Sequence, residues 1–75
     1  MNFEEFTLAM EIRKFSGEMQ NRLVQKKKAG YSGWDDPSWT REQIIERLKI
    51  SLEKGNMVDV ANFAMFANLR GGSNE

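Results

Sequence analysis

The chain has 75 residues, which is enough for one domain with a small core. It contains no cysteine and no histidine, and this excludes disulfides, histidine-ligated zinc, a histidine general base and a Ser-His triad. Eleven basic residues balance eleven acidic ones, and this neutral balance disfavours a dedicated nucleic-acid-binding protein.

The first predicted element is a long helix over residues 3–28 with apolar side chains on two faces. Its main stripe has helical spacing and consists of Leu8, Ile12, Phe15, Met19 and Leu23. A shorter second stripe on the opposite side consists of Phe3, Phe6 and Met10. Lys26, Lys27 and Lys28 close the helix, where we expect a solvated end that complements the helix dipole.

Residues 29–37 form a predicted loop with two glycines and an Asp-Asp-Pro sequence. The next helix starts near Ser38 or Thr40, and Thr40 with Gln43 has the pattern of a capping box. Its predicted apolar face consists of Ile44, Ile45, Leu48 and Leu52, opposite a charged face. Lys54 and Gly55 end this helix.

The third predicted helix starts after its cap Asn56 and runs to about Arg70. It is apolar nearly all round, with one expected face made by Val60, Phe63, Ala64 and Ala67 and another by Val58, Met65 and Leu69. Residues 73–75 are an expected disordered tail, which leaves one helical domain over residues 1–72.

These patterns predict an all-α protein, in which a long N-terminal helix joins a helical hairpin. Three helices of one small chain cannot easily cover two apolar faces on both the first and the third helix, so we expect a helical-bundle homodimer. The expected dimer interface contains Phe3, Phe6, Met10, Val58, Met65 and Leu69. No apolar run approaches the ~20 residues of a membrane span, and the start of the chain lacks the pattern of a signal peptide. We therefore expect a cytoplasmic protein with no membrane partner.

The segment Asp59-Val60-Ala61-Asn62-Phe63-Ala64-Met65, with Gly33-Trp34 before it, resembles the all-α nucleoside triphosphate pyrophosphohydrolases of the MazG type. The similarity is greatest to their small phage-encoded relatives and covers roughly residues 15–70. It implies an all-α scaffold on which carboxylates at i and i+3 of facing helices hold Mg²⁺. Asp59 matches the aspartate of the family's Glu-x-x-Asp pair, and Asn62 matches an asparagine at a nucleotide-contacting position.

The chain departs from that pattern in its acids. Asn56 stands where the family has the glutamate of Glu-x-x-Asp, and residues 48–53 contain no Glu-x-x-Glu pair. A single carboxylate binds Mg²⁺ weakly, because several protein oxygens must replace the water molecules bound to the ion. The sequence therefore indicates a shortened relative that keeps the scaffold without catalytic residues, a cofactor or a bound metal. The alternative metal site would use Asp59 with Glu46 or Glu53 across a dimer interface.

Five residues are candidate contacts for a ligand or partner: Asp59, Asn62, Trp34, Trp39 and Ile50. For each, a structural role competes with the functional one. Asp59 is favoured as a helix-capping acid, Asn62 as an amide bonded within a helix interface, and the tryptophans as lids on the core. Ile50 lies beside the charged face of its helix, either by chance or as part of a partner surface.

Two functions follow as expectations. The first is a non-catalytic phage or prophage accessory protein that binds a host or phage protein, in the cytoplasm of the host bacterium. The second is a minimal Mg²⁺-dependent nucleoside triphosphate pyrophosphohydrolase or nucleotide-binding protein. Nucleic-acid binding through Lys26–Lys28 and the tryptophans is disfavoured by the zero net charge.

Overall fold

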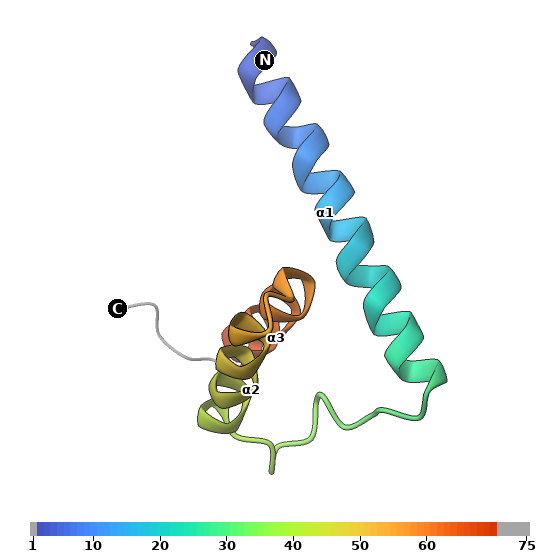
Figure 1. Cartoon of the computed structure of the whole chain (residues 1–75), viewed down its shortest axis with the longest axis vertical. Helices are drawn as coiled ribbons and strands as arrows, with labels where there is room; N and C mark the ends of the chain where they lie inside the picture. Colours follow the sequence, from blue (N-terminus) through green and yellow to red (C-terminus); the bar gives the residue numbers. More distant parts are fainter. Residues whose placement is uncertain (1, 71–75) are drawn as a thin grey trace.

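A computed structural model describes residues 2–70 and contains three helices in that range: α1 (Phe3–Lys28), α2 (Arg41–Glu53) and α3 (Met57–Leu69). The all-α prediction, with a long first helix and a helical hairpin, is confirmed. Helix α3 is the central element, because it packs against α2 and against the C-terminal half of α1 (Figure 1). The prediction for the tail at residues 73–75 lies outside the described residues.

Each helix begins at a side-chain cap. The Asn2 side chain accepts a hydrogen bond from the Glu5 amide at the start of α1. At α2 the capping box is formed by Thr40 and Gln43, so Thr40 and not Ser38 is the N-cap. The hairpin turn follows α2 at Lys54, and the next residue, Gly55, has φ +75°, a left-handed conformation that favours glycine.

The core lies between α2 and α3 and is small. Its buried apolar residues are Ile44, Phe66 and Ala67, and partly buried Leu23, Trp39, Ile45 and Phe63 pack around them. The expected α2 face is only partly covered, since Leu52 at its end is 51% exposed. The expected α3 face was wrong in detail. Ala64 is exposed, and the buried positions are Asp59, Asn62, Phe66 and Ala67, so the polar residues point inward.

The N-terminal half of α1 extends past the hairpin into solvent (Figure 1). We call residues 3–15 the arm. All its large apolar side chains are exposed: Phe3, Phe6, Leu8, Met10, Ile12 and Phe15. The second stripe is therefore bare, and the main stripe is bare along the arm. Only from Met19 onward does the main stripe become partly buried, because α3 covers it there.

Candidate functional site

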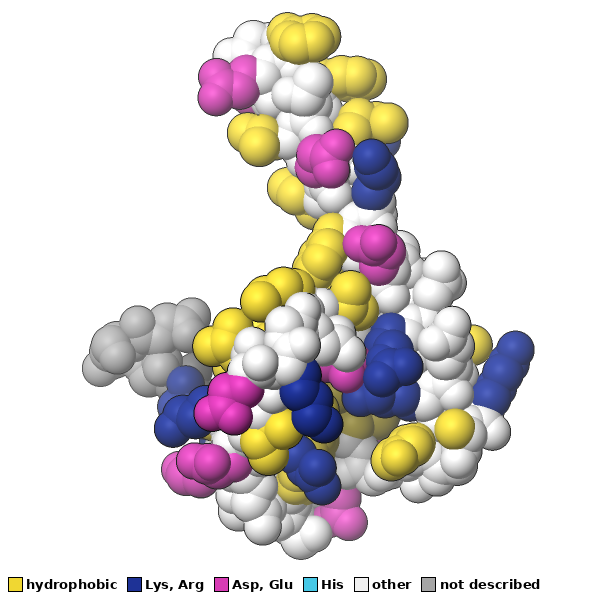
Figure 2. Space-filling model, in the orientation of Figure 1, with side chains coloured by type: hydrophobic (Ala, Val, Ile, Leu, Met, Phe, Trp, Pro, Cys, Tyr) yellow, Lys and Arg dark blue, Asp and Glu magenta, His cyan; other side chains and the backbone are white. Residues whose placement is uncertain are grey.

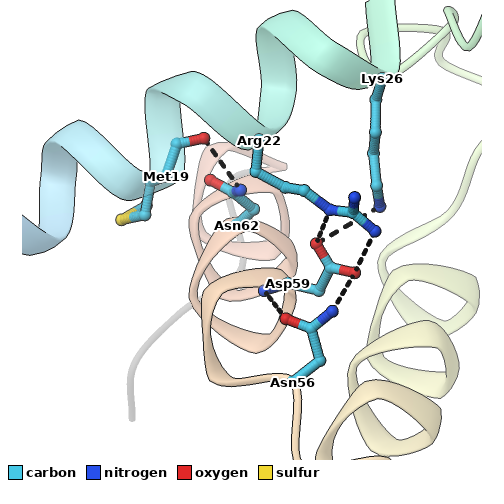
Figure 3. Close-up of polar contacts among 6 residues, drawn as sticks. All are labelled: Met19, Arg22, Lys26, Asn56, Asp59 and Asn62. Carbon is cyan, nitrogen blue, oxygen red and sulfur yellow. Dashed lines mark hydrogen bonds and ion pairs between the residues drawn. The ribbon is translucent and has the colours of Figure 1, made fainter. Parts of the chain in front are cut away.

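The most connected polar group of the described residues is the Asp59 carboxylate, in the first turn of α3 (Figure 3). Arg22 of α1 donates from Nε to its Oδ1 at 3.0 Å and from Nη2 to its Oδ2 at 3.4 Å. Lys26, one turn further along α1, places Nζ 3.5 Å from Oδ1. The Asn56 amide donates to Oδ2 at 2.9 Å and accepts from the Asp59 backbone N–H at 3.0 Å. Both carboxylate oxygens are therefore held by this chain's own donors.

The local sequence explains this arrangement. Arg22 and Lys26 are four residues apart, so both project from one face of α1. Asn56 and Asp59 stand at the N-cap and third positions of α3, where the Asn56 side chain accepts from the Asp59 backbone N–H and donates to the Asp59 carboxylate. The positive end of the α3 dipole also favours an anion there. The Asn56 cap is thus present, but the Asp59 carboxylate accepts from the Asn56 side-chain amide, so it does not complete the expected capping box. Two cations that the sequence analysis did not assign to Asp59 complete the site.

Opposing effects set the pKa of Asp59. Burial is the largest of them and raises the pKa, because only 10% of the side chain is exposed. The hydrogen bond from Arg22, the charge of Lys26 and the charge of Arg22 act together in the other direction and prevail, so the pKa lies below its ordinary value of 3.8. The hydrogen bond with Asp59 and then its charge raise the pKa of Arg22. The pair is therefore ionised at neutral pH.

Asn62 lies one turn after Asp59 and is 3% exposed. Its amide Nδ2 donates to the carbonyl of Met19 on α1 at 3.2 Å (Figure 3), which is the contact within a helix interface that we expected. Its Oδ1 is buried without a hydrogen-bond partner among the described residues. Asn62 and Asp59 together fix where α3 crosses α1.

Lys26 is not the solvated end residue that the sequence suggested. Its side chain is only 28% exposed, because the ammonium group lies between Asp59 and the face of the Phe63 ring, 5.1 Å from the ring centroid. The attraction between Lys26 and Asp59 stabilises the packing of the last turns of α1 against α3. Helical periodicity alone does not predict this ion pair. Lys27 and Lys28 are exposed, as expected.

Both tryptophans cover the core, as the structural interpretation predicted. Trp34 stacks on Phe66 with centroids 5.5 Å apart, and Trp39 meets Phe66 at 6.1 Å and Phe63 at 6.2 Å. Arg70 holds this loop from the far end of α3, donating to the carbonyls of Trp34 at 2.6 Å and Asp36 at 2.7 Å. The role of Arg70 was missed, since its only sequence signal is a cation at a helix end.

A groove of about 1080 Å³ opens beside this site, between the end of α1, the loop and the hairpin. Its wall combines cations with aromatic rings: Arg22, Lys26, Lys27, Arg47, Lys54, Tyr31, Trp34 and Trp39. Ile50, 44% exposed, also lines it, so the apolar residue beside the charged face of α2 faces this groove. Five cations and one carboxylate, Asp59, give the groove a positive field.

The remaining candidates lie apart from Asp59. Glu46 and Glu53 are exposed on α2, and within residues 2–70 no three carboxylates form a group suited to a metal ion. Among the expected dimer residues of α3, Val58 is half-buried, whereas Met65 and Leu69 are 36% and 60% exposed. None of the helices in the described range has the length and apolarity to cross a membrane.

No protein-family model matches this chain, and neither the curated proteins nor the solved structures contain a match. The resemblance to the MazG-type enzymes accordingly stands on the residues quoted for it.

Proposed function

We propose that this protein is a small, non-catalytic accessory protein that acts by binding other proteins, including a second copy of itself. The arm carries the proposal. A helix of 13 residues is marginal in water on its own, yet here it extends into solvent with six large apolar side chains exposed. Exposed apolar surface of this kind is typical of an interaction site.

The contacts of Asp59 support a non-catalytic role. A Mg²⁺ ion at this carboxylate would have to displace Arg22, Lys26 and the Asn56 amide, and would sit beside two positive charges. The acid that corresponds to the family's metal ligand serves here to join α1 to α3. We infer that a MazG-like scaffold of phage or prophage origin has been turned to protein binding in the cytoplasm of a host bacterium.

The chemistry of the arm indicates the kind of partner. Phe3, Phe6 and Met10 recur at the spacing by which an amphipathic helix fills an apolar groove. The heterologous partner is therefore a host or phage protein with such a groove, and the acting form that we propose is a homodimer.

A photo-crosslinking amino acid in place of Phe6 tests this proposal in a lysate of phage-infected host cells. We expect one protein to be captured from Phe6 and not from Glu46, an exposed position of α2 that serves as the matched control. The captured protein, once purified, should bind the wild-type chain and bind the Phe3→Ser/Phe6→Ser variant at least ten-fold more weakly. Equal capture from both positions, or equal affinity of both chains, contradicts the proposal.

The groove supports one alternative, a Mg²⁺-dependent nucleoside triphosphate pyrophosphohydrolase or nucleotide-binding protein. Its tryptophans offer rings for a base, and its cations offer charge for phosphates. Incubation with nucleoside triphosphates and Mg²⁺ distinguishes the two functions. Pyrophosphate release that the Asp59→Ala variant loses would establish the alternative. Absence of both release and nucleotide binding would remove it.

A further inference from the structure

We propose that the main stripe of the arm (Leu8, Ile12 and Phe15) is covered by the same stripe of a second copy, with the two α1 helices antiparallel and a two-fold axis near Ile12. This geometry rests on the homodimer proposed above. It leaves the second stripe, Phe3, Phe6 and Met10, available to the heterologous partner, in place of the role in the dimer interface that we expected from the sequence.

The first argument is that one helix face is covered at one end and bare at the other. Met19 and Leu23 lie partly buried where α3 covers the stripe. Leu8, Ile12 and Phe15 continue the same face and are 56%, 67% and 36% exposed. Figure 2 shows apolar side chains along the arm, above the point where it meets the hairpin. The hairpin ends too early to cover them, so the uncovered length needs an element from outside this chain.

The second argument is that the bare stripe is self-complementary. Its spacings are four residues from Leu8 to Ile12 and three from Ile12 to Phe15. When two such helices run antiparallel, Ile12 meets its counterpart, and each Leu8 lies opposite the Phe15 of the other copy. A two-fold interface requires this property, because one patch must fit itself.

The third argument is charge, which selects the antiparallel orientation. Residues 3–12 carry three carboxylates and no cation, whereas residues 22–28 carry four cations and no carboxylate. Two parallel copies would set these like charges side by side. In the antiparallel pair the acidic start of each arm is directed toward the basic end of the other copy's α1, and the like-charged segments stay apart.

The edges of the stripe agree with this arrangement. Glu4 and Glu5 form no ion pair within the described part of the chain, so their charge is not offset inside one copy. Glu11 would lie near its own counterpart beside the axis. It is paired with Lys14 of the same copy at 3.5 Å, which offsets the repulsion.

The opposite face of the arm fits a second copy less well. Beyond Met10 that side of α1 continues into Arg13, Lys14 and Gly17, which are charged or lack a side chain. Its apolar part therefore ends after two helical turns. The main stripe, by contrast, continues into Met19 and the core.

Single cysteines test the geometry directly, because the natural chain has none. Met10 and Ile12 lie in one helical turn and project about 200° apart, so Met10→Cys is a matched control for Ile12→Cys. Under mild oxidation at micromolar concentration we expect Ile12→Cys to form disulfide-linked dimers at least ten-fold faster. A mixture of Leu8→Cys and Phe15→Cys proteins should give the mixed disulfide, whereas Leu8→Cys alone should not, since its two copies lie about 12 Å apart along the axis.

Mass measurement by light scattering separates this proposal from the one on which it rests. A mass of one chain for the wild-type protein overturns the homodimer and this geometry together. A dimeric mass with faster linkage at Met10→Cys, or with no difference between the two positions, overturns only the geometry. Circular dichroism confirms that each variant retains its helices, which we expect because all four replaced side chains are exposed.

Discussion

At the scale of single residues, Asp59 joins α1 to α3 through its contacts with Arg22 and Lys26, and the sequence did not predict these contacts. Its position in the third helix and its cap could be predicted, because Asn56 and Asp59 have capping spacing. The ion pair with Arg22 could not, since the two residues are 37 positions apart and helix periodicity does not tell how two helices cross. Lys26 was misjudged for the same reason. The interactions between residues close in the sequence could therefore be predicted, whereas the contact between α1 and α3 could not.

We predict that Asp59→Asn lowers the free energy of unfolding by roughly 1–3 kcal/mol at neutral pH, the low end reflecting solvent screening at the half-exposed Arg22. Because the folded pKa of Asp59 lies below 3.8, the unfolded chain binds the proton more readily. The stabilisation from ionised Asp59 is therefore complete above the unfolded pKa and is lost as the pH falls below it, through the folded pKa.

Urea denaturation of both proteins from pH 7 to pH 2.5 measures this effect. The difference in unfolding free energy between wild type and Asp59→Asn should shrink as the pH falls below about 4. Asp35→Asn, at an exposed loop position, is the control and should leave stability unchanged within about 0.5 kcal/mol. A difference that stays constant with pH would show that the charge of Asp59 does not contribute.

At the scale of elements, the three helices and their ends followed from the sequence because caps and turn residues are local signals. The ends of the first helix and the hairpin turn at Lys54 and Gly55 agree with the structure. The face of α3 that is buried against the other helices could not be predicted from the sequence. An apolar helix offers no contrast between its sides, so its pattern cannot show that Asp59 and Asn62 would point toward α1.

The choice between two sequence candidates for the α2 cap gives a matched test. We expect Thr40→Ala to lower the free energy of unfolding by about 1 kcal/mol, because it removes the hydroxyl that accepts from the backbone N–H of Gln43. Ser38→Ala should cost less, since Ser38 bonds only Asp36 in the exposed loop. Thermal unfolding of the two variants measures the difference. A larger loss for Ser38→Ala would place the start of the helix earlier than the structure does.

At the scale of the whole molecule, the chain is an arm joined to a small hairpin body. The mismatch between three helices and two apolar faces on the first and third of them predicted that some surface would stay bare. It named Phe3, Phe6 and Met10 on the first helix, but it did not predict that the main stripe would also be bare along the arm. The structure places most of that surface on the arm, because α3 crosses α1 beyond its middle. The main stripe is therefore divided between an internal contact and an open one.

If antiparallel arms form the dimer, its stability should depend on the charges at their tips. Glu4→Lys/Glu5→Lys reverses the charge of the segment that the antiparallel pair directs toward the basic end of the other α1, and we expect the dimer dissociation constant to rise about ten-fold or more at low salt. The control Glu46→Lys/Glu53→Lys changes net charge equally on the exposed face of α2. Sedimentation equilibrium of both variants measures the effect. An equal change in both would mean that net charge, and not the arm tip, controls association.

Arg70 joins the end of α3 to the loop before α2 through its hydrogen bonds to the carbonyls of Trp34 and Asp36. Residues 34–70 form a ring of chain closed by two hydrogen bonds rather than by a covalent link. Proteolytic trimming that reaches Arg70 would open this ring and release Trp34 from Phe66, while leaving the arm unchanged. Carboxypeptidase digestion followed by tryptophan fluorescence would therefore show a step in emission at the removal of that one residue.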